Sequence, residues 1–164
     1  MTPVPAPVIS SPIRNERARG LQGKRAGIAS RIAADAIDWG IVVAIYVGIL
    51  LCLALFEYFV GSGKFDVPRP PTGVTLVSEW MIAVLYLTAG WTGRNRTVGK
   101  SVIGLRVVTN GGQPLRPRRA FFRALICATL GAIALGWVII SKRRAGIHDI
   151  AVRTSVVYDW TPTA

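Results

Sequence analysis

The feature that most constrains this chain is an uncharged apolar run between Trp39 and Phe56. It holds 18 consecutive residues without Asp, Glu, Lys or Arg. As an α-helix with a 1.5 Å rise per residue, the run reaches about 27 Å, close to the thickness of the hydrocarbon core of a bilayer. We therefore predict a membrane-spanning helix in the apolar segment 37–60.

Two further apolar segments, 74–91 and 124–141, follow along the chain. The chain is 51% hydrophobic, which is high for a soluble protein of 164 residues. Segment 74–91 is long enough to span only if Glu79 lies inside it. For segment 124–141, hydropathy favours a crossing, whereas its basic flanks favour a re-entrant or interfacial element broken at Gly131 or Gly136. The expected fold is an all-α integral membrane protein with two to three transmembrane helices.

The net charge of +12 is concentrated next to the apolar segments. Residues 1–38 carry six Lys and Arg residues and residues 92–123 carry eight, whereas the connection 61–73 carries two. The positive-inside rule then places the N-terminus and the 92–123 region in the cytoplasm. This placement explains the charge without nucleic acid, so we expect no nucleic-acid partner. We expect the lipid bilayer as partner, with anionic lipids attracted to the basic surface.

The ends of the chain and the stretches between apolar segments complete the domain plan. Residues 1–26, which are rich in proline and charge, predict a disordered cytoplasmic tail. Residues 27–157 form the predicted membrane domain, and 158–164 a short C-terminal tail. The first apolar run begins too late and is too long for a cleavable signal peptide.

A small cytoplasmic β element is expected from two short stretches. "SVIGLRVVT" (101–109), followed by a turn at 110–112, predicts one strand, and "RTSVV" (153–157) predicts another. If the two strands pair, both lie on one side of the membrane, which requires an even number of crossings between them.

The loop "GRNRTVGKS" (93–101) resembles a phosphate-binding loop but does not fit one. Such a loop has four residues between its first glycine and its Gly-Lys pair, whereas five separate Gly93 from Gly99. A phosphate-binding loop also leads into a helix, whereas the residues that follow this loop predict extended structure. We expect no nucleotide site.

Ionisable residues near the start of the first span are the candidates for function. On a helix Arg31, Asp35 and Asp38 share one stripe, and Arg31 is placed to pair with Asp35. Asp38 is either a functional acid at the membrane boundary or a solvated residue at headgroup level. Cys52 and Cys127 are expected to be small buried hydrophobic residues. No pattern indicates a metal site or a catalytic nucleophile, so we expect no cofactor, no metal and no enzyme activity.

Four ordered motifs resemble the RDD family of small bacterial membrane proteins, named for one arginine and two aspartates. They are "RIAADAID" (31–38), "TVGKSVIGLRVV" (97–108), "GGQPLRPRRAFFRAL" (111–125) and "GIHDIAVRTSVV" (146–157). The resemblance implies that Arg31, Asp38 and Asp149 are the family's named residues, and that "TVGKS" is its Thr-x-Gly-Lys element. The supporting residues that we expect beside them are Asp35, Gly99, Lys100, Arg123 and His148.

The resemblance implies a multi-pass protein of the bacterial cytoplasmic membrane, but no general activity is established for the family. Two hypotheses remain. One is a non-catalytic membrane module that acts by assembly or lipid contact. The other is a small oligomeric transporter, or a cation- or proton-coupled carrier, that uses Asp38 and Arg31. A homo-oligomer or a membrane-protein partner is expected, because two or three helices enclose little volume. Under the carrier hypothesis, Asp38→Asn should spare folding and abolish flux.

Overall fold

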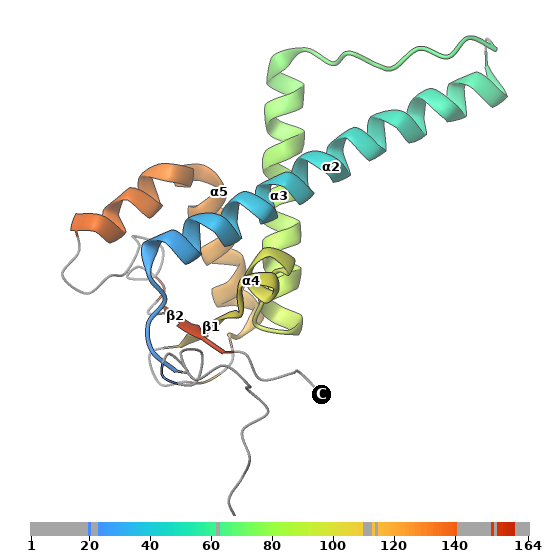
Figure 1. The fold of residues 1–164 in the computed structure, drawn as a ribbon. Coiled ribbons are helices and arrows are strands. Elements are labelled where there is room, and N and C mark those ends of the chain that lie inside the picture. Colours follow the sequence, from blue (N-terminus) through green and yellow to red (C-terminus); the bar gives the residue numbers. More distant parts are fainter. Residues whose placement is uncertain are drawn as a thin grey trace, which may run out of the picture.

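The protein is mostly helical, with one small sheet. The computed structural model describes residues 20, 23–61, 63–109, 113, 115–140, 152 and 154–159, with the backbone alone for 132–140. The elements are α2 (Ile28–Val60), α3 (Thr72–Gly93), α4 (Val98–Ile103), β1 (Leu105–Thr109), α5 (Pro117–Ile140) and β2 (Thr154–Tyr158). The long helices α2 and α3 cross each other, and α4 and the sheet gather at one end of the molecule (Figure 1).

Helices α2 and α3 are the two elements of the described chain that are long and apolar enough to cross a membrane, with 33 and 22 residues. They contain the predicted segments 37–60 and 74–91, and Glu79 lies inside α3 as the second span required. Large apolar side chains such as Leu53, Phe56 and Leu85 are exposed along them. A helix that is apolar on its exposed faces suits contact with lipid rather than water.

Helix α5 is broken at Gly131, which lies in the third apolar segment. Gly131 has φ 44° and ψ −124°, a conformation that side chains with a Cβ rarely adopt. The part before the break, residues 117–130, reaches only about 21 Å, which is shorter than the hydrocarbon core. Segment 124–141 is therefore not one straight spanning helix, and of the two glycines considered, Gly131 is where the helix breaks.

The sheet joins three distant segments at one end of the molecule. Strands β1 and β2 are antiparallel, with Leu105 opposite Tyr158 and Thr109 opposite Thr154. This pairing confirms the predicted β element. Residues 23–26 run along the other side of β2, where the Ala26 N–H donates to the Val156 carbonyl oxygen at 2.9 Å. The residues before α2, β1 and β2 thus lie together.

This sheet restricts how the chain can cross a membrane. If α2 and α3 both cross a membrane, one outward and one returning, residues 23–26 and β1 lie on the same side of it, as the sheet requires. The chain between β1 and β2 also begins and ends at the sheet, so it makes no net crossing. In a membrane, the pairing of β1 with β2 requires an even number of crossings between them, so one crossing by the third apolar segment does not fit it.

The predicted extended structure across 101–109 is wrong in its first part, because Val98–Ile103 form the short helix α4. The Thr97 hydroxyl oxygen accepts a hydrogen bond from the Lys100 N–H at 3.4 Å at its start. Gly104, with φ 74° and ψ 39°, ends it in the left-handed conformation that glycine tolerates. These two caps outweigh the β-branched residues between them. The loop 93–101 does lead into a helix. It therefore differs from a phosphate loop only in the five residues between Gly93 and Gly99 and in following a helix rather than a strand.

Two segments at the ends of the domain lie against the sheet. Strand β2 extends to Tyr158, and Asp159 beyond it is buried and forms an ion pair with Arg96 at 2.8 Å. Residues 23–26, at the end of the predicted tail, are hydrogen-bonded to β2.

The turn at 110–112 lies outside the described residues. On either side of it, the Thr109 N–H donates to the Gln113 carbonyl oxygen at 2.9 Å.

Candidate functional site

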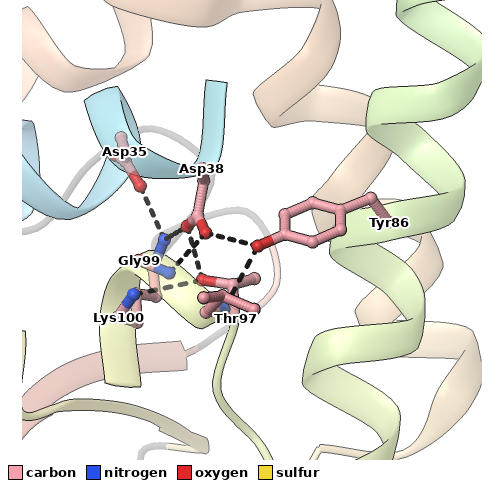
Figure 2. A network of polar contacts seen from close by, with 7 residues as sticks. Asp35, Asp38, Tyr86, Thr97, Gly99 and Lys100 are labelled. Atoms are coloured by element: carbon pink, nitrogen blue, oxygen red, sulfur yellow. Dashed lines mark hydrogen bonds and ion pairs between the residues drawn. The ribbon is translucent and has the colours of Figure 1, made fainter. Parts of the chain in front are cut away.

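The carboxylate of Asp38 is the centre of a buried polar network. Asp38 lies on α2 and is 4% exposed. Its Oδ1 accepts hydrogen bonds from the Tyr86 hydroxyl at 2.7 Å and from the Gly99 N–H at 2.8 Å. Its Oδ2 accepts from the Thr97 hydroxyl and lies 3.5 Å from Lys100 Nζ (Figure 2). Donors from α3, from the 94–97 loop and from α4 thus converge on one carboxylate of α2.

The N-terminus of α4 points at this carboxylate. The first N–H groups of a helix have no partner within the helix and favour a nearby negative charge. Here the Gly99 N–H donates to Asp38, and the Val98 N–H donates to the Tyr86 hydroxyl oxygen at 3.1 Å. Helix α4 is therefore held against α2 and α3 by its N-terminus.

Only glycine fits at position 99. A Cβ placed there would lie 2.8 Å from Asp38 Oδ1 and closer still to the carbonyl oxygen of Ala34. These contacts explain the order of residues in "TVGK". Thr97 caps the helix and donates to Asp38, Gly99 allows the close approach, and Lys100 supplies the counter-charge.

Lys100 forms ion pairs with both aspartates of the helical stripe. Its Nζ lies 2.6 Å from Asp35 Oδ1 and 3.5 Å from Asp38 Oδ2. The expected pair between Arg31 and Asp35 is wrong, because α4 inserts Lys100 beside Asp35. Arg31 is 2% exposed, and with Asp35, Lys100 and Arg123 it lines a small buried cavity of about 10 Å³.

Trp91 of α3 lies next to two cations. The Arg123 guanidinium carbon is 4.4 Å from the centre of the indole ring, and Lys100 Nζ is 5.5 Å from it. Both distances are within the range of a cation–π interaction. Trp91 and Arg123 are each 1% exposed. Through this contact α5 joins the charged cluster that α2 and α4 form.

The structure brings together six of the eight residues that the sequence singled out. Asp38, Asp35, Gly99 and Lys100 are in direct contact, and Arg31 and Arg123 lie beside them. Asp149 and His148 lie outside the described residues, so their positions stay predictions. Two contact residues are absent from the predicted site residues, although Thr97 belongs to the Thr-x-Gly-Lys element. Tyr86 carries no signal within its apolar segment, whereas Thr97, which precedes Val-Gly-Lys, carries the signal of a helix cap.

A larger cavity of about 470 Å³ lies beside the network, between α2, α3 and α5. Its walls are mostly apolar, and Asp35 and Asp38 also line it. Within the described residues, no group of three His, Cys, Asp or Glu side chains is placed to hold a metal ion. The apolar walls suit an apolar group.

Comparison with known proteins identifies one family. The model of the RDD family matches residues 25–153. The match includes every residue of the network around Asp38 and stops just before β2. No curated protein and no solved structure matches the chain.

We predict that Asp38→Asn destabilises the protein. The amide would keep one acceptor for Gly99 and Tyr86, but its NH₂ group would replace the oxygen that now accepts from Thr97 and faces Lys100. Loss of one member of a buried ion pair costs about 3–5 kcal/mol. Thermal unfolding of the purified protein in detergent should show a lower midpoint. This expectation replaces the sequence-based one, in which the substitution spares folding.

Two further variants separate the buried ion pair from a general effect of lost charge. Asp66→Asn removes a charge from an exposed loop position and should leave the unfolding midpoint unchanged. Combining Asp38→Asn with Lys100→Met removes both buried charges and should cost less than the sum of the two single substitutions. A midpoint for Asp38→Asn equal to that of the wild type would contradict the architectural role.

Proposed function

We propose, from the premise that the chain belongs to the RDD family of membrane proteins, that it is a non-catalytic module of the bacterial cytoplasmic membrane. In this proposal the module acts by contact with lipids and by assembly with other membrane proteins or with copies of itself. The motif residues would build the domain rather than perform a reaction. The observation that carries the proposal is that both oxygens of the Asp38 carboxylate already accept hydrogen bonds from the protein.

Saturation of Asp38 favours an architectural role because a carrier must exchange partners. Both oxygens of Asp38 have donors, and the carboxylate is almost completely buried. To bind a transported ion, it would have to release α4, which the same hydrogen bonds hold in place. A buried charge that is paired and hydrogen-bonded in this way is tolerated as part of the fold.

The proposed orientation places the N-terminus, the sheet and α4 in the cytoplasm. The charge pattern supports it, because residues 92–123 carry eight Lys and Arg residues. The sheet supports it as well, since it holds residues 23–26 and β1 at the same end. The connection between α2 and α3 would then lie on the outer side.

Cysteine labelling of intact cells tests this orientation. In a variant with Cys52 and Cys127 replaced by alanine, a membrane-impermeant maleimide should label Lys64→Cys in intact cells. Arg118→Cys should be labelled only after the cells are permeabilised. Both positions are exposed, so access depends on the side of the membrane. The reversed pattern would overturn the proposed orientation.

The first turns of α5 provide the surface that we propose for lipid contact. Arg116, Arg118 and Arg119 are exposed there. They are followed by Phe121 and Phe122, which are 43% and 58% exposed. Basic residues next to exposed aromatic rings suit the boundary between headgroups and acyl chains. Anionic headgroups fit the arginines, whose attraction to an anionic membrane surface is about 1 kcal/mol per residue.

We predict that Arg118→Gln combined with Arg119→Gln weakens binding of anionic lipid. The loss of two cations should lower affinity for phosphatidylglycerol about 30-fold, measured by native mass spectrometry of the detergent-solubilised protein. Binding of phosphatidylcholine should not change. As a matched control, Lys64→Gln with Arg69→Gln removes two charges from the opposite connection and should have no effect. Equal losses in both double variants would contradict a specific surface.

The carrier hypothesis keeps one observation in its favour, because Asp35 and Asp38 both line the larger cavity. Liposomes containing the purified protein distinguish it from the architectural proposal. We predict fluxes of H⁺, Na⁺ and K⁺ equal to those of protein-free liposomes, because the Asp38 oxygens are already occupied. A flux that the wild type supports and the partly exposed Asp35→Asn variant lacks would show a carrier instead.

A further inference from the structure

We infer that the cavity between α2, α3 and α5 is a binding site for a single-chain amphiphile with a positively charged amine at one end. The inference goes beyond the proposed lipid contact, because the surface around Arg118 binds anionic headgroups and is distinct from this cavity. It rests on the volume, the lining and the arrangement of charges around the cavity.

The size and the walls of the cavity suit an apolar chain. Its volume of about 470 Å³ lies within the range of small-molecule sites. Val42, Leu87 and Ala128 are among the apolar residues that line it, one from each of the three helices. Burial of apolar surface against such walls would supply most of the binding free energy.

The charged side chains that line the cavity are Asp35 and Asp38. Of the two aspartates, Asp38 has both oxygens occupied by hydrogen-bond donors. Asp35 has one oxygen paired with Lys100, and its side chain is 33% exposed. Within the described residues, its Oδ2 accepts no hydrogen bond, so it can accept one from an amine. A charged amine would therefore meet Asp35 at the wall.

The cations of the cluster lie on the other side of this wall. Arg31, Lys100 and Arg123 line the small buried cavity of about 10 Å³, and none of them lines the larger one. Asp35, Trp91 and Cys127 line both and lie between the two spaces. A ligand in the larger cavity thus contacts carboxylate and indole rather than arginine or lysine.

The indole ring of Trp39 in the wall also favours a cationic group. Trp39 lines the cavity, and a cation within about 6 Å of an indole ring is attracted to its face. Ile32 and Trp39 are each 51% exposed, which places the aspartate end of the cavity next to the surface. An amphiphile in the bilayer could enter there with its charge near the headgroups and its chain inside.

Tryptophan quenching tests the site in the full-length protein, solubilised in a non-ionic detergent. The probes are 12-bromododecylamine, 12-bromododecanol and 12-bromododecanoate, which share one chain length and differ in the polar end. We expect saturable quenching by the amine, with an affinity about tenfold above that for the alcohol and for the carboxylate. Asp35→Asn should lower the affinity for the amine to that for the alcohol.

Cavity-filling variants separate the site from partition into the detergent micelle. Ala36→Leu and Ala128→Leu each add bulk to the wall and should reduce or abolish saturable quenching by all three probes. Leu76→Phe, at an exposed position that does not line the cavity, should leave quenching unchanged. If a filling variant does not elute as a folded protein, the affinities of the amine, the alcohol and the carboxylate for the wild type and for Asp35→Asn still test the inference. Equal affinities for amine and carboxylate, or no effect of filling, would overturn the inference.

Discussion

The arrangement of the described chain depends on the need of the Asp38 carboxylate for hydrogen-bond donors. A carboxylate removed from water is stable only when donors or counter-charges replace its hydration. Helix α2 alone has no free donor to offer at this position, so donors come from Tyr86 on α3 and from Thr97, Gly99 and Lys100. One buried acid therefore fixes how the two long apolar helices and the short helix α4 meet.

A second group of charges extends this junction to α5. Arg31, Lys100 and Arg123 supply three positive charges next to the two carboxylates of Asp35 and Asp38. Trp91 shields the group, with Lys100 and Arg123 against its ring. One further carboxylate would balance the charge. Asp149, which the family resemblance names, is the candidate for it, and since Asp149 lies outside the described residues, its place in the cluster stays a prediction.

The sequence predicts the parts of this structure that follow from periodicity and hydropathy. It predicts two long apolar helices, the stripe of Arg31, Asp35 and Asp38, and two short strands that pair if they lie on one side of the membrane. It does not give the partner of Asp35, because residues 65 positions apart meet only through the tertiary fold. The sequence does not predict helix α4, because its β-branched residues indicate a strand, whereas in the structure the caps at Thr97 and Gly104 outweigh that preference. No local pattern distinguishes Tyr86 from other apolar positions.

The junction and the larger cavity share residues, which links the stability of one to the shape of the other. Asp38 and Trp91 are held by α4 and α5 and at the same time form the wall of the cavity. A change that releases α4 would move Asp38 and Trp91, so the shape of the cavity depends on the intact network around Asp38. Asp35 differs, because it is partly exposed and contributes one ion pair. It is therefore the residue at which ligand contact can change without loss of the fold.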